Sequence, residues 1–188
     1  MAGGLGVAAL MCAGAATAGG QQIRVTLDPA TTHINFTLAA TLHTVHGTFK
    51  LKSGQIQWDA ATGDASGSIA IDATSGDTDN ASRDKNMQNQ VLESGKFPEI
   101  TFRPSQIKGA LNKEGSSQLE VTGVIHIHGQ DHDQTLNLTV EQGAGGTLQT
   151  TTQFPIPYVK WGIKDPSTFL LHVADTVNVE IQATASLQ

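Results

Sequence analysis

Cysteine is almost absent from this sequence of 188 residues, and its one cysteine, Cys12, lies in an apolar first segment. If that segment is removed, the mature chain can form no disulfide and offers no thiolate for catalysis or zinc binding. Positive charge is also scarce, with 11 Lys and Arg against 17 Asp and Glu and no run of basic residues. Because binding to a phosphate backbone requires a surplus of cations, the charge balance excludes nucleic acid as a partner.

A long, strongly hydrophobic run is missing as well. Residues 2–20 carry no charge, but they are rich in Gly and Ala and poor in Leu, Ile and Phe, which does not suit a stable membrane span. The small residues Ala16-Thr17-Ala18 instead match the cleavage site of a signal peptide. We therefore predict a signal peptide over residues 1–20, a mature domain over residues 21–188, and a periplasmic or secreted location.

Short segments with alternating apolar and polar residues dominate the rest of the chain. Apolar residues that recur at every second position, with many Thr, Val and Ile residues, are typical of half-buried antiparallel strands. Gly-, Asp- and Pro-containing turns separate these segments. Many short strands and few helices predict an all-β sandwich or barrel. The clearest alternating segments are residues 33–38, 69–71, 99–103, 135–140 and 176–181.

One segment, around residues 80–93, lacks this alternation. Met87 and Val91 are four positions apart and therefore share one face of a helix. Asp79, Asn80 or Ser82 can cap the start of this helix, and Gly95 can end it. The sequence thus predicts one short helix inserted between two strands.

The seven histidines raise the question of a metal or catalytic site. His43 and His46 are three apart in an expected strand, so they point to opposite sides and cannot hold one ion. His126 and His128 share a strand face, with His132 in the following turn, and His-x-His is a real metal-ligand spacing. A metal site also needs further ligands and supporting contacts, which this strand does not supply. We predict no metal site and no catalytic residue, and we keep a metal-dependent enzyme built on His126, His128 and His132 as an alternative.

Four segments, in this order, match a known pattern over nearly the whole mature chain. The first contains Asp28-Pro29, Thr32, Phe36, Val45, Gly47 and Phe49; the second contains Ser75, Thr78, Asn80, Arg83 and Asp84. The third contains Phe97-Pro98, Ile100 and Phe102, and the fourth is the expected hairpin over residues 121–138. Together they resemble the YceI-like family of bacterial exported polyisoprenoid-binding proteins. This chain has Tyr158 at a position where that family often has Arg.

The resemblance implies an eight-stranded antiparallel, lipocalin-like barrel with an elongated apolar cavity. It also implies non-catalytic binding or carriage of a long-chain polyisoprenoid or similar amphiphilic lipid, with that lipid as the ligand and no cofactor. A homodimer is compatible with the sequence. A structural β-domain with a filled core is a second alternative, since alternation does not distinguish a filled barrel from a hollow one.

The expected ligand-binding residues are the apolar members of the inward faces. With the resemblance, the alternation predicts that the cavity is lined by Phe36, Leu38, Val45, Phe49, Ile69, Ile71, Ile100, Phe102, Val121, Ile125, Leu136, Leu138 and Trp161. The polar neighbours Thr37, Thr48 and Thr101, together with Ala70, should face outward.

Overall fold

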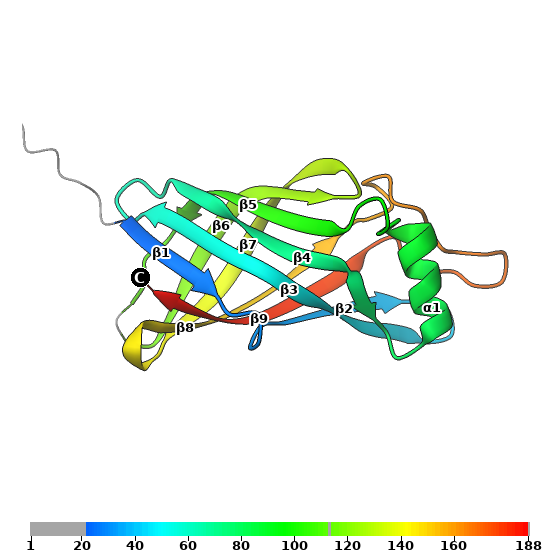
Figure 1. Ribbon diagram of the computed structural model, residues 1–188, viewed down its shortest axis with the longest axis horizontal. Coiled ribbons are helices and arrows are strands. Elements are labelled where there is room, and N and C mark those ends of the chain that lie inside the picture. The colour runs from blue at the N-terminus through cyan, green and yellow to red at the C-terminus, as the bar shows by residue number, and fades with distance from the viewer. Residues whose placement is uncertain (1–21, 113, 188) are drawn as a thin grey trace, which may run out of the picture.

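The computed structural model describes residues 22–112 and 114–187, so the predicted signal peptide lies outside the described residues (Figure 1). The strands are β1 (Gln22–Leu27), β2 (His33–Ala39), β3 (Thr44–Asp59), β4 (Ala65–Asp77), β5 (Glu99–Lys108), β6 (Ser116–Ile127), β7 (Gln130–Gln142), β8 (Thr147–Ile156) and β9 (Val177–Leu187). The helical segments are α1 (Ala81–Asn86), the π-helical turn η1 (Met87–Val91) and the 3₁₀ turn η2 (Ala144–Gly146).

The strands close into a barrel. They form one antiparallel sheet in the order β1-β3-β2-β9-β8-β7-β6-β5-β4. The last strand, β4, also pairs with β3 near the other end of this order, and this pairing closes the sheet. β1 and β2 follow each other in the space between β3 and β9, and each pairs with both of these strands. The two short strands therefore fill one position of a closed eight-position barrel, which confirms the predicted architecture.

The predicted helix is present and covers one end of the barrel, as Figure 1 shows. Of the three candidate caps, the structure selects Asn80, whose side chain accepts a hydrogen bond from the Arg83 backbone N–H at 3.0 Å. The α-helical part continues directly into the π-helical turn, and Glu93 follows with a φ of 46°. Within the described residues, no helix is long and apolar enough to cross a membrane.

The opposite end of the barrel is filled with side chains. We call it the filled end and define it by Val25, Trp58, Leu119, Val140 and Leu148, all of which are buried in one apolar cluster. The pairing of Gln22–Thr26 in β1 with Gln55–Asp59 in β3 brings two of these residues to this end. In Figure 1, β1 and α1 lie at opposite ends of the barrel, so the buried cluster around Val25 and Trp58 packs the end away from the helix.

Candidate ligand-binding cavity

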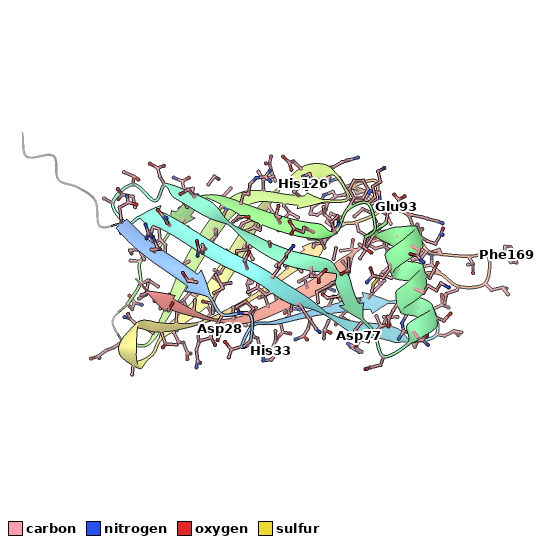
Figure 2. The ribbon with its side chains drawn as sticks, viewed as in Figure 1. Asp28, His33, Asp77, Glu93, His126 and Phe169 are labelled. Atoms are coloured by element: carbon pink, nitrogen blue, oxygen red, sulfur yellow. The ribbon has the colours of Figure 1, made fainter. Side chains whose placement is uncertain are left out.

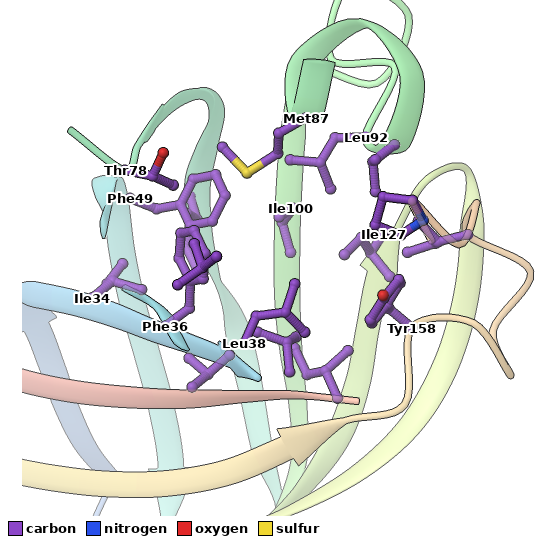
Figure 3. A pocket seen from close by; sticks show the side chains of 18 of the residues that line it. Ile34, Phe36, Leu38, Phe49, Thr78, Met87, Leu92, Ile100, Ile127 and Tyr158 are labelled. Carbon is purple, nitrogen blue, oxygen red and sulfur yellow. The ribbon is translucent and has the colours of Figure 1, made fainter. Parts of the chain in front are cut away.

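A cavity of about 820 Å³ occupies the barrel at the helix end, within the size range of small-molecule sites. Its wall is overwhelmingly apolar, and Figure 3 shows side chains from the strands and from the helical segment converging on one space. Met87 and Leu92 reach it from the helical segment, while Ile34, Leu38 and Ile100 reach it from the strands. The cavity is thus an apolar chamber with the helix at its mouth.

Two glycines allow bulky side chains to build one wall of the chamber. The rings of Phe36 and Phe49 lie 5.3 Å apart between centroids. A Cβ atom at Gly47 would lie 2.3 Å from the Phe36 ring, so only glycine leaves room for it. At Gly76, an added Cβ would lie 2.6 Å from the Met87 side chain and 2.7 Å from the Phe49 ring. The absence of a side chain at these positions brings the aromatic pair and the helix together.

Polar groups border the cavity mainly along residues 78–86, at the start of the helix. Arg83 donates from Nε to the Thr78 hydroxyl and from Nη2 to the Thr78 carbonyl, each at 2.7 Å. The Asp84 carboxylate accepts from the Thr78 backbone N–H at 3.0 Å and also from its hydroxyl. These bonds fix a guanidinium, which stays charged at all ordinary pH values, beside an otherwise apolar chamber.

The structure brings most of the predicted ligand-binding residues together around this chamber. Those that line it are Phe36, Leu38, Val45, Phe49, Ile69, Ile71, Ile100, Phe102, Ile125 and Leu136. Among the predicted outward residues, Thr48 is exposed, whereas Thr101 borders the cavity between its two inward neighbours.

Three other residues of the predicted set, Val121, Leu138 and Trp161, lie outside the lining of the chamber. Val121 faces inward but is buried in the apolar cluster that continues into the filled end, and Leu138 packs against the same cluster. Trp161 lies in the connection between β8 and β9, where its ring stacks on His132 at 4.2 Å with an interplanar angle of 4°. For Val121 and Leu138 an inward direction was therefore insufficient, because both pack in or against the buried cluster, whereas Trp161 belongs to no strand.

Several residues that line the chamber were not in the predicted set. Some lie on β9, where alternation was identified in the sequence, and others lie on β8, in the helical segment or in the connection between β8 and β9. These residues include Met87, Val91, Leu92, Phe154, Ile156, Tyr158, Ile163, Val173, Val177, Val179 and Ile181. The inward face of β9 could have been found from its period of two, but the connection carries no periodic signal.

The three histidines of the alternative metal site lie in three different environments. His126 faces outward, and its Nδ1 lies 2.6 Å from Oδ1 of Asp131 (Figure 2). That hydrogen bond, with a further one from Arg103, holds the pKa of Asp131 below its usual value. His132 instead stacks on Trp161.

His128 does not share a strand face with His126, contrary to the prediction. β6 ends at Ile127, and His128 adopts a φ of 52° in the turn that follows. Its Nε2 lies 2.7 Å from Oε2 of Glu93, and its ring lies 4.7 Å from the Phe97 ring. His128 therefore links the end of the helical segment to the turn between β6 and β7. In the part of the chain that the structure describes, no three His, Cys, Asp or Glu side chains gather as a metal site.

His43 and His46 point to opposite sides of the wall. His43 borders the cavity at its mouth, whereas Nδ1 of His46 lies 3.3 Å from the Thr37 hydroxyl on the outer surface.

Tyr158 takes the position at which the resembling family often has Arg, and it lines the chamber. Its side chain is buried, and its hydroxyl donates a hydrogen bond of 2.8 Å to the Ala174 carbonyl. Burial, and then the nearby charges of Asp165 and Asp175, raise the pKa of Tyr158 to about 12. The hydroxyl thus remains protonated and ties the β8–β9 connection to the wall.

Because Tyr158 is the only tyrosine, its titration can be followed directly. We expect the tyrosinate absorbance of the folded protein to rise with a midpoint near pH 12, against about 10 for the unfolded chain. Tyr158 binds its proton more tightly when folded, so its contribution to stability is complete below pH 10 and is lost as the pH approaches 12. The same titration in strong denaturant is the control. A midpoint near 10 in the folded state would show that the hydroxyl is solvated.

Comparison with known proteins gives a consistent picture. The model of the YceI-like domain matches residues 25–185. A UPF0312 protein of Vibrio parahaemolyticus is 30% identical over 87 residues, covering 45% of this chain and 44% of that protein. Protein YceI of Salmonella arizonae is 33% identical over 94 residues, covering 49% of this chain and 47% of that protein. The matched regions thus span about half the length of these curated relatives.

Two solved structures have the same fold. A polyisoprenoid binding domain from Saccharophagus degradans, implicated in plant cell wall breakdown, superposes with a TM-score of 0.68 at 15% identity. The superposed region covers 87% of this chain and 98% of the chain of that domain. BcnA of Burkholderia cenocepacia gives a TM-score of 0.69 at 23% identity and covers 84% of this chain and 98% of its own.

Proposed function

The chain belongs to the YceI-like family, and from this premise we propose that it binds a long-chain polyisoprenoid or a similar amphiphilic lipid without catalysing a reaction. The observation that carries the proposal is the apolar chamber of about 820 Å³ at the helix end of the barrel. Such a chamber suits a molecule that has a long apolar tail. A structural domain with a filled core would not need it.

The geometry also favours one orientation of the ligand. The tail lies in the chamber, where each buried CH₂ group contributes about 0.8 kcal/mol. The polar head lies at the mouth, where Thr78, Arg83 and Asn86 border the cavity. A head placed deeper would face Phe102, Ile125 and their neighbours and would lose its hydration without finding a partner.

The polar groups at the chamber support binding rather than chemistry. Arg83 is held by Thr78 and cannot act as a base, and Tyr158 keeps its proton because its pKa is raised to about 12. We further propose that the protein acts after export, in the bacterial cell envelope or outside it, on the basis of the uncharged segment over residues 2–20.

Native mass spectrometry tests the proposal directly. The full chain, including the predicted signal peptide, is expressed in a bacterial host, purified without detergent, and measured before and after organic extraction. We expect an added mass that extraction removes, and an extract whose species differ by whole isoprene units or by CH₂ units of one lipid class. A protein that never carries lipid, even after incubation with a lipid-rich bacterial extract, would refute the proposal and favour the structural domain.

A further inference from the structure

Large apolar side chains are exposed at one place in the described part of the chain. Leu42 is 82% exposed, Phe169 is 101% exposed and Leu170 is 84% exposed. They belong to two loops at the helix end of the barrel, namely the β2–β3 turn and the β8–β9 connection. We call these three residues the mouth patch. Exposure of apolar side chains of this size to water costs free energy, so their gathering at one end of the molecule indicates an interaction surface.

Hydrogen bonds join the two loops into one unit. The Thr41 backbone N–H donates to the His172 carbonyl at 2.9 Å, and the His172 backbone N–H donates to the Thr41 hydroxyl at 3.0 Å. Next to them, Ala40 and Val173 form an antiparallel bridge. Leu42, Phe169 and Leu170 are therefore presented by one connected rim.

The same rim forms part of the chamber wall. Ala40, Leu171 and Val173 line the cavity. The apolar surface of the chamber therefore continues through this rim to the mouth patch outside. A lipid tail that leaves the chamber at this end passes beside the patch.

The patch projects instead of forming a groove. Figure 2 shows Phe169 at the tip of a loop that extends beyond α1, away from the body of the barrel. A projecting tip with Phe and Leu suits insertion into a soft apolar medium, since it offers little flat area against which another folded protein could pack.

We propose that the mouth patch inserts into the surface of a lipid bilayer and holds the open end of the chamber against it. A lipid then passes between membrane and cavity without its tail crossing water. This inference rests on the proposed function, because it is the lipid ligand that gives the exposed rim a reason to meet a membrane. The formal net charge of −6 gives no general attraction to anionic lipids, so apolar insertion must supply most of the binding.

Vesicle flotation tests the proposal with two kinds of vesicle, phosphatidylcholine alone and phosphatidylethanolamine mixed with phosphatidylglycerol. The full chain should float with both, and F169D/L170D should lower the bound-to-free ratio at least about tenfold. F169S/L170S removes the apolar groups without adding charge and should have nearly the same effect. The matched control is Q142D/A144D, which adds two carboxylates at exposed positions, at the end of β7 and the start of η2, and should bind like the parent.

Two outcomes would overturn the docking proposal, and each is distinct from failure of lipid binding. The parent protein could remain unbound to both vesicles, or F169D/L170D could float as well as the parent. The same samples are examined for retained lipid by native mass spectrometry. Retained lipid without flotation refutes docking alone, whereas flotation without retained lipid refutes the proposed function and leaves the patch as a membrane anchor.

Discussion

Ile71→Arg is expected to reduce lipid retention at least about a hundredfold, which corresponds to roughly 2.8 kcal/mol of lost binding free energy. Ile71 lines the chamber from β4, between Leu51 on β3 and Ile100 on β5. An arginine here faces the space that the tail would occupy. The tail would have to bury the guanidinium without a carboxylate partner or displace its long side chain, and both are costly. The measurement is lipid-to-protein stoichiometry by native mass spectrometry and by extraction.

Thr48→Arg is the matched control for this variant. Thr48 lies on β3 beside the same chamber but is exposed on the outside of the barrel. The substitution adds the same side chain without entering the cavity, so we expect lipid retention to remain at the level of the parent. Thermal unfolding by circular dichroism accompanies both variants and shows that each is folded at the temperature of the assay. A folded Ile71→Arg protein that retains lipid like the parent would show that the ligand lies elsewhere.

Among the variants considered, Trp58→Ala is expected to lower the free energy of unfolding the most, by about 3–5 kcal/mol. Trp58 is only 7% exposed and belongs to the apolar cluster of the filled end, where β3 pairs with both β1 and β4. Removal of the indole leaves a void between strands that come from distant parts of the chain. Urea unfolding followed by circular dichroism measures the change.

Trp161→Ala provides the comparison, because the chain has only two tryptophans. Trp161 lies in a connection and stacks on His132, so its loss should cost about 0.5–1.5 kcal/mol for the stacked pair plus a small burial term. Neither residue lines the chamber, and both variants should therefore keep their lipid under conditions where they are folded. Equal losses of stability in the two variants would contradict the assignment of Trp58 to the packed end of the barrel.

Local alternation alone predicted the direction of strand side chains at most positions, although Thr101, expected to face outward, borders the cavity. Phe36 and Leu38, or Ile69 and Ile71, are two apart, and in a strand this spacing places them on one face whatever the rest of the chain does. The start of the helix also depends on a local interaction, since the Asn80 side chain accepts a hydrogen bond from a backbone N–H three residues later. The number of barrel strands and the presence of a cavity followed from family resemblance, not from these local patterns.

Tertiary structure alone decided which inward-facing residues meet the cavity. Val121 and Ile125 lie on the same face of β6, yet only Ile125 lines the chamber. The difference follows position along the barrel, because Val121 pairs with the buried Ile107, which is also outside the lining, whereas Ile125 pairs with Phe102, which lines the chamber. The direction of a side chain depends on its own backbone, whereas an enclosed volume depends on side chains contributed by strands far apart in the sequence.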